Sequence, residues 1–286
     1  MTALQLPLLS TVSAISPALE LPFEYNAAAA FVDGPLARGW GERIAIRTAE
    51  RSWTYAALAE RVSRAGNALR ALGVEMEQRV AFLLYDSPQF ACAFFGAMKI
   101  GAVAVPLNTQ LRPQDYQYML NDSRAHVLVA EADLWAQIAP LRRELPFLRQ
   151  VVLVQRDTLA GAATPGTLDF DALCAGARPA LAAAPTTRDD AALWLYSSGS
   201  TGFPKGCVHL QHDMYVCCEL YAKPVLGITP EDITFSAAKL YFAYGLGNGL
   251  YFPLSVGASA IHYPGRITPE AAFRTIAEQR PTIFFG

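Results

Sequence analysis

One segment of the chain, residues 196–206, has a composition suited to binding phosphate. It reads Tyr-Ser-Ser-Gly-Ser-Thr-Gly-Phe-Pro-Lys-Gly and follows the apolar run at residues 193–195. Glycines allow crowded turns in which successive backbone N–H groups converge on an anion. The hydroxyl side chains add hydrogen-bond donors, and Lys205 adds a positive charge. We therefore predict that this segment binds the β- and γ-phosphates of ATP.

The predicted phosphate contacts differ in spacing from the better-known phosphate-binding loops. They are Ser197, Ser198, Gly199, Ser200, Thr201, Gly202 and Lys205. In the P-loop, lysine is followed directly by serine or threonine, whereas Gly206 follows Lys205 here. The GxGxxG turn of dinucleotide-binding proteins does not match either. A solvated connection between elements is the alternative, and eleven suitable positions in a row after a strand disfavour it.

A second segment, residues 239–248, places aromatic side chains beside small ones. Its central residues are Phe242, Ala243, Tyr244 and Gly245. Such a combination can form a flat apolar slot, in which an aryl ring gains about 1 kcal/mol from ring–ring contacts beyond its burial. The alternative is an aromatic helix of the hydrophobic core.

The elements that must position these segments alternate between short apolar strands and helices. Strands are predicted at residues 44–47, 80–84, 103–105, 127–129, 151–154, 193–196, 234–237, 259–261 and 282–285. Helical patterns lie between most of them, and after Gly206 we expect a helix that runs through residues 214–221. The alternation predicts an α/β fold with parallel sheets covered by helices.

Capping residues mark where the helices begin and end. Thr54 precedes one helical pattern, and Ser87 and Thr268, each followed by proline, precede two others. Gly73 and Gly101 stand where two of the helices should end.

Composition excludes several classes of function. The net charge is −2 and no block of lysine or arginine occurs, so nucleic-acid binding has no electrostatic support. The five cysteines form no CxxC pair, which predicts free thiols in a reducing compartment. The longest apolar region, residues 90–107, is interrupted by Lys99, Gly101 and Pro106 and predicts a helix followed by a strand. We expect a cytoplasmic protein with neither a nucleic-acid nor a membrane partner.

Residues 196–206 resemble the signature of the adenylate-forming superfamily, which includes acyl- and aryl-CoA ligases, firefly-type luciferases and peptide-synthetase adenylation domains. Residues 53–58 resemble its T-Y-x-x-L element, and residues 98–108 resemble its G-A-x-x-x-P-L-N element. The resemblance extends from about residue 40 to the end of the chain.

The resemblance implies the layered N-terminal domain of such an enzyme, in truncated form. We expect residues 1–25 to be a loose lead-in and residues 77–219 to form a first α/β subdomain that ends in the phosphate-binding loop. Residues 26–76 and 220–286 would form a second, incomplete α/β subdomain. We expect the C-terminal domain with its adenylation lysine beyond Gly286, together with the glutamate that helps to hold Mg²⁺ and the aspartate that holds the ribose. The chain alone is therefore predicted to lack ligase activity.

The resemblance also indicates a substrate. In the superfamily the region of residues 239–248 lines the carboxylic-acid pocket, and many members carry histidine where Phe242 stands. Residues 243–245, Ala-Tyr-Gly, are similar to the version in benzoate-CoA ligases. This implies ATP-dependent activation of a benzoate-like acid to an acyl-adenylate, followed by transfer to coenzyme A. ATP, Mg²⁺ and coenzyme A would be required, with no metal ligand within this chain.

Two alternatives stay open. The chain could belong to an adenylating enzyme for another acid or for a carrier protein, although residues 241–247 lack the aspartate with which amino-acid-activating members hold the substrate amine. It could also be a non-catalytic ATP-binding module. His209 and His212 follow the phosphate-binding segment and are assigned no chemical role.

Overall fold

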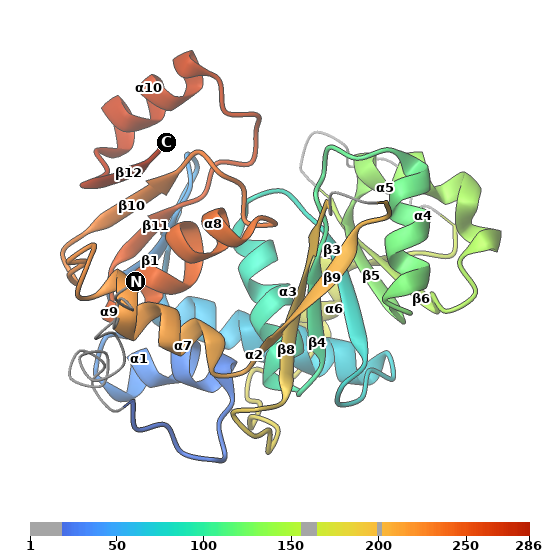
Figure 1. Ribbon diagram of the computed structural model, residues 1–286, viewed down its shortest axis with the longest axis horizontal. Coiled ribbons are helices and arrows are strands. Elements are labelled where there is room, and N and C mark those ends of the chain that lie inside the picture. Colours follow the sequence, from blue (N-terminus) through green and yellow to red (C-terminus); the bar gives the residue numbers. More distant parts are fainter. Residues whose placement is uncertain (1–18, 156–164, 199–201) are drawn as a thin grey trace, which may run out of the picture.

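The computed structural model describes residues 19–155, 165–198 and 202–286. Within these ranges the strands form two sheets, one of seven strands and one of five, and helices cover both (Figure 1). One hydrophobic core contains residues from both sheets and joins them. The predicted α/β class is confirmed. Every helix in these ranges is too short or too polar to cross a membrane.

The seven-stranded sheet is built almost entirely from the middle of the chain. Its strands are β3 (Arg79–Leu83), β4 (Val103–Pro106), β5 (Val127–Glu131), β6 (Gln150–Val154), β7 (Leu168–Asp169), β8 (Ala191–Ser197) and β9 (Lys205–Leu210). Their order is β7-β6-β5-β3-β4-β8-β9. Neighbours are parallel except for the antiparallel pair β8–β9.

Helices bury both faces of this sheet. One face carries α2 (Tyr55–Ala71), α3 (Pro88–Lys99) and α6 (Phe170–Gly176), and the other carries α4 (Pro113–Asp122), α5 (Ala132–Ile138) and the 3₁₀ turn Ala139–Glu144. Successive strand side chains point to opposite faces. Val80 and Phe82 of β3 therefore join the first core, whereas Ala81 and Leu83 join the second. This two-sided burial explains why the strands appear in the sequence as continuous apolar runs.

The five-stranded sheet combines the two ends of the described chain. Its strands are β1 (Ile44–Arg47), β2 (Ser52–Thr54), β10 (Ile233–Ser236), β11 (Ser259–Ile261) and β12 (Ile283–Phe285). Their order is β12-β10-β11-β1-β2, with only β1–β2 antiparallel among the described pairs. The surrounding helical segments are Ala29–Asp33, α1 (Gly34–Ala37), α7 (Asp213–Cys217), Cys218–Ala222, α8 (Ala243–Leu246), Gly247–Tyr251, α9 (Phe252–Val256) and α10 (Pro269–Gln279).

The predicted helix caps are confirmed. The hydroxyl oxygens of Thr54, Ser87 and Thr268 accept a hydrogen bond from the backbone N–H three residues later, at 3.2, 3.3 and 3.2 Å. Gly73 and Gly101 follow α2 and α3 with φ of 81° and 77°, the left-handed conformation that glycine adopts without strain.

The helix expected over residues 214–221 is confirmed, but the strand that precedes it was not predicted. Residues 205–210 form β9, and the helix begins only at Asp213 and becomes π-helical over Cys218–Ala222. The edge strand β2 was not predicted either. The two-residue edge strand β7, which pairs in parallel with β6, was also missed. Strands β2 and β9 are antiparallel edges whose pairing partners supply the hydrogen bonds, so their own apolar patterns are weak.

Helix α2 lies between the two sheets and packs on α3 and α6. It approaches α3 closely, because a Cβ on Gly66 would lie 2.9 Å from the carbonyl oxygen of Gly96. Nearby, the buried Lys99 ammonium donates to Asp33 Oδ1 at 2.7 Å and to Ser63 Oγ at 3.2 Å. The subdomain boundaries proposed from the sequence stay a prediction.

The last residues of the segment predicted as a lead-in are hydrogen-bonded to the body of the chain. The Tyr25 N–H donates to the Thr186 carbonyl at 2.9 Å, and the Arg188 N–H donates to the Phe23 carbonyl at 2.8 Å. Residues 1–18 of that segment lie outside the described residues.

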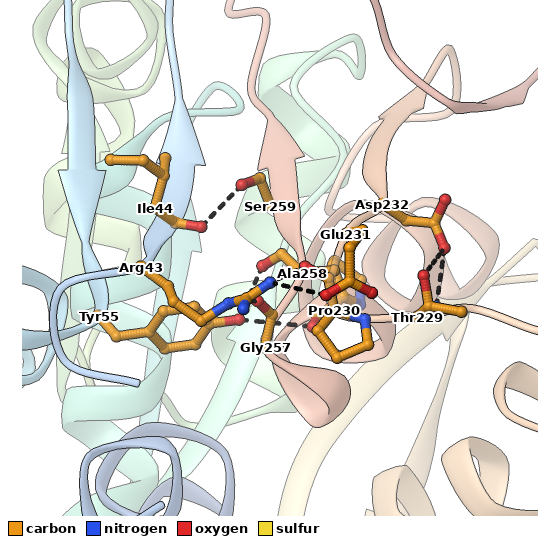
Figure 2. Close-up of polar contacts among 11 residues, drawn as sticks. Arg43, Ile44, Tyr55, Thr229, Pro230, Glu231, Asp232, Gly257, Ala258 and Ser259 are labelled. Atoms are coloured by element: carbon orange, nitrogen blue, oxygen red, sulfur yellow. Dashed lines mark hydrogen bonds and ion pairs between the residues drawn. The ribbon is translucent and has the colours of Figure 1, made fainter. Parts of the chain in front are cut away.

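A single arginine joins three strand ends of the five-stranded sheet (Figure 2). Arg43, just before β1, donates through Nε to the Gly257 carbonyl at 2.8 Å and through Nη2 to the Pro230 carbonyl. Its guanidinium also lies 3.7 Å from the Glu231 carboxylate. Gly257 precedes β11 and Pro230 precedes β10, so Arg43 holds β1 in register with strands that are about 200 residues away in sequence.

Candidate functional site

The predicted phosphate-binding segment includes the connection between the two strands of the β8–β9 hairpin. Ser197 is the last residue of β8 and lies opposite Lys205, the first residue of β9. Ser197, Ser198, Gly202 and Lys205 are all exposed, and Gly202 has φ of 141°, which only glycine adopts readily. The remaining predicted contacts, Gly199, Ser200 and Thr201, lie outside the described residues. Exposure leaves the donors accessible, and their role with phosphate stays a prediction.

Helix α4 holds both sides of this hairpin. The Tyr196 hydroxyl, on β8, donates to Asp122 Oδ2 at 2.7 Å. Burial, together with this hydrogen bond, raises the pKa of Tyr196 well above its usual value, so the phenol stays a donor. On the other side, the Phe203 ring stacks on Tyr118, with centroids 4.8 Å apart and 19° between the planes. The loop between Tyr196 and Phe203 therefore starts and ends on one rigid helix.

The predicted substrate segment lies between the two sheets. Phe242 is the N-cap residue of α8, which begins at Ala243. Phe242 and Tyr244 are 48% and 53% exposed to solvent. The two rings are therefore not part of the hydrophobic core, and the alternative of an aromatic core helix does not hold. Tyr244 meets Phe285, at the end of β12, edge to face at 6.2 Å. The segment thus presents two accessible rings beside the end of the described chain.

Gly245 allows α8 to fold back onto the preceding turn. A Cβ at this position would lie 2.1 Å from the carbonyl oxygen of Lys239 and 2.5 Å from that of Ala238. No side chain fits there, so the glycine is required by the close approach of the backbone. This is a local requirement of the segment and does not by itself identify a ligand.

A cavity of about 460 Å³ lies next to the substrate segment. Its lining residues are Tyr85, Thr109, Gln110, Lys239, Pro264, Gly265 and Arg266. They come from the chain just after β3, β4, β10 and β11, and the carboxyl ends of strands are where α/β sheets place their ligands. The predicted residues 242–245 do not line this cavity, but they begin three positions after Lys239, which does.

The described residues contain no cluster of three or more His, Cys, Asp or Glu side chains that could hold a metal ion. The two histidines after the hairpin have local partners: His209 Nδ1 lies 3.1 Å from Asp213 Oδ2, and His212 Nδ1 lies 2.8 Å from the Arg188 carbonyl. That the two histidines have no chemical role stays a prediction.

A family profile described as "AMP-binding enzyme" matches residues 36–286, which is most of the chain. This chain belongs to the AMP-binding enzyme family. The match includes the hairpin, the substrate segment and both sheets, so the family resemblance inferred from short motifs is confirmed.

Several relatives of this AMP-binding enzyme act on aromatic acids, according to their names. The chain is 45% identical to a benzoate–CoA ligase of Thauera aromatica, over 94% of this chain and 50% of the relative. It is 40% identical to a 4-hydroxybenzoate–CoA/benzoate–CoA ligase of Rhodopseudomonas palustris, over 92% of this chain and 48% of the relative. The chain thus spans about half the length of the curated relatives it matches.

Solved structures agree with these relatives. The crystal structure of the anthranilate CoA ligase AuaEII in complex with anthranoyl-AMP superposes with a TM-score of 0.90 at 35% identity, covering 95% of this AMP-binding enzyme chain and 51% of that one. A benzoate CoA ligase from Burkholderia xenovorans LB400 gives a TM-score of 0.81 at 41% identity, covering 92% of this chain and 50% of that one. The fold described above is therefore that of the first half of such ligases.

The sequence analysis missed the side chains that hold the two candidate segments in place. Tyr118 and Asp122 anchor the hairpin from α4, and Asp86 contacts the substrate segment from the end of β3. A signal existed for Asp86, since it is an acidic residue three positions after an apolar strand. No sequence signal pairs Tyr118 with Phe203, because they are 85 positions apart and join only when β9 adds to the sheet.

Proposed function

We propose that the complete gene product containing this chain activates a benzoate-like aromatic acid with ATP and transfers it to coenzyme A. The observation that carries the proposal is the 45% identity to a benzoate–CoA ligase over 94% of this chain. The accessible rings of Phe242 and Tyr244 supply the kind of surface on which an aryl acid could bind.

In the proposed reaction, a carboxylate oxygen attacks the α-phosphorus of ATP, and the bond from that phosphorus to the bridging oxygen of pyrophosphate breaks. The products are an acyl-adenylate and pyrophosphate. The coenzyme A thiolate then attacks the acyl carbon and AMP leaves. Phosphoryl-centred displacement depends mainly on positioning and on neutralising charge. Mg²⁺, when bound, would neutralise charge on the phosphate oxygens.

Within this chain, we assign the hairpin to the leaving pyrophosphate. Lys205 would neutralise one negative charge, and the hydroxyls of Ser197 and Ser198 would donate hydrogen bonds to the β- and γ-phosphates. The antiparallel pairing of Ser197 with Lys205 would keep these two residues opposite each other. Gly199, Ser200, Thr201 and Gly202 would supply further backbone and hydroxyl donors.

We assign residues 242–245 to the acid. An aromatic ring would lie against Phe242 or Tyr244, and Ala243 and Gly245 leave room beside these rings. Since ATP and coenzyme A are present in the cytoplasm and all five cysteines are free thiols, we also propose a cytoplasmic location.

Pyrophosphate release by the complete gene product tests the proposal. Benzoate should support release at least ten times faster than octanoate or phenylalanine, and benzoyl-CoA should form when coenzyme A is added. Release with an amino acid instead of benzoate would indicate a carrier-protein adenylation enzyme, and ATP binding without release by the complete product would indicate a non-catalytic module. Either outcome contradicts the proposal.

A further inference from the structure

An aspartate from the seven-stranded sheet contacts the substrate segment of the other sheet. Asp86 lies three residues after β3 and is 6% exposed. Its Oδ1 accepts a hydrogen bond from the Leu240 N–H at 3.0 Å, across 154 positions of sequence. Its Oδ2 lies 3.5 Å from the Lys239 ammonium, and both side chains are largely buried. One carboxylate thus holds two consecutive residues of the opposite half.

Lys239 continues this contact into the chain after β11. Its ammonium donates to the Tyr263 carbonyl at 2.7 Å and lies 5.6 Å from the centre of the Tyr263 ring. Tyr263 in turn precedes the loop of residues 264–266 that lines the cavity. Asp86, Lys239 and Tyr263 therefore connect the end of β3, the start of the substrate segment and the cavity loop.

The backbone of Lys239 and Leu240 determines where the substrate segment lies. The Lys239 carbonyl accepts the Phe242 N–H at 3.0 Å, which closes the turn into α8. The backbone of α8 also packs directly against the Lys239 carbonyl oxygen at Gly245, so closely that no side-chain atom fits between them. Consequently, a shift of Lys239 would carry Phe242 and the residues after it along as a unit.

We propose that Asp86 is the positioning residue of the aromatic-acid pocket. It acts through Lys239 and Leu240 and fixes the distance between the rings of the substrate segment and the carboxyl edge of the seven-stranded sheet. The identity of the acid in this inference rests on the proposed function. The contact between Asp86 and the substrate segment is observed independently of that function.

The chemistry of the contact favours positioning over simple stabilisation. Burying a lysine and an aspartate removes both from water, and a well-packed apolar pair is often as stable as a buried ion pair. A buried pair does, however, impose a specific geometry through its hydrogen bonds. Here the contacts of Asp86 fix the position of the substrate segment relative to the seven-stranded sheet.

The pair formed by Lys99 and Asp33 provides a matched control. It is also an ion pair between a buried lysine and an aspartate, with 2.7 Å between Nζ and Oδ1. It joins α3 to the helical segment Ala29–Asp33, and neither residue lines the cavity or belongs to the substrate segment. Loss of this pair should affect the free energy of unfolding without moving the acid.

The test compares Asp86→Asn, Asp86→Ala and Asp33→Asn in the complete gene product. Asp86→Asn keeps an acceptor for the Leu240 N–H but loses the charge that faces Lys239, so the KM for benzoate should rise about 10-fold. Asp86→Ala loses both and should raise it about 100-fold. The KM for ATP should stay within about 2-fold in both variants, and Asp33→Asn should leave both KM values within that range.

Hydrogen exchange of the backbone amides gives a readout that needs no turnover. The amides of residues 240–246 should exchange at least ten times faster in Asp86→Asn than in the parent protein, and Asp33→Asn should not accelerate them. If benzoate is not a substrate at all, the proposed function fails, and the exchange rates still decide whether Asp86 holds the segment. If Asp86→Ala does not fold, the near-isosteric asparagine variant decides both measurements.

Two results would overturn the inference. Unchanged exchange at residues 240–246 in Asp86→Asn would mean that the carboxylate does not hold the segment. Equal increases in the KM for benzoate and for ATP would mean that Asp86 has a general structural role and does not position the acid. A selective rise in the KM for benzoate, with faster exchange confined to this segment, supports it.

Discussion

Replacing Gly245 by alanine should destabilise the chain and distort the substrate segment. The added Cβ would lie 2.1 Å from the Lys239 carbonyl oxygen, whereas carbon and oxygen atoms in contact are roughly 3.5 Å apart. The oxygen cannot simply move away, because it accepts the Phe242 N–H that closes the turn. Helix α8 must therefore retreat by roughly 1 Å or the turn must open.

The expected cost follows from this overlap. Forcing an extra methyl group into a tightly packed site typically costs about 1–3 kcal/mol. Alanine is favoured over glycine in a helix by about 0.5–1 kcal/mol, which offsets a small part of that cost. We expect a net loss of about 1–2 kcal/mol in the free energy of unfolding.

Gly176→Ala is the matched control. Gly176 is the last residue of α6, and a Cβ there would meet no atom within 4 Å. This substitution should change the free energy of unfolding by less than about 0.5 kcal/mol. Urea titrations of the two variants and the parent chain, followed by circular dichroism, measure the difference. If Gly245→Ala unfolds at the same urea concentration as Gly176→Ala, the close approach of α8 to Lys239 is wrong.

Three further substitutions test other parts of the structure. Lys205→Ala in the complete gene product should slow pyrophosphate release about 100-fold, and an unchanged rate would remove the lysine from the phosphate site. Arg43→Met leaves the carbonyls of Gly257 and Pro230 without this donor and should lower the free energy of unfolding by about 1–3 kcal/mol; an unchanged urea midpoint contradicts the role in strand register. Burial lowers the pKa of His262 from 6.5 to about 4, so the unfolded chain binds the proton more tightly. The free energy of unfolding should therefore rise with pH between about 4 and 6.5, and it should rise less steeply in His262→Gln; equal slopes would show that this histidine does not contribute.

Local interactions made much of this protein predictable from its sequence. Thr54, Ser87 and Thr268 each bond a backbone N–H three residues away, so the helix starts are encoded within one turn. The central strands β3, β4, β5 and β6 are buried on both faces and appear as apolar runs such as residues 80–84. The glycine- and hydroxyl-rich hairpin end and the aromatic substrate segment were likewise visible as short patterns.

Tertiary structure alone decided how these parts meet. Strand β1 pairs with β11, which lies more than 200 positions later in the chain. Nothing in the sequence of either strand indicates that the two should pair. Strand β9 has a mixed pattern and became a strand because β8 offered an edge. Asp86 reaches Leu240 only after both sheets have formed. Caps and apolar periodicity act within a few residues, whereas sheet order and contacts between the halves depend on which distant surfaces bury one another, and that information is spread over the whole chain.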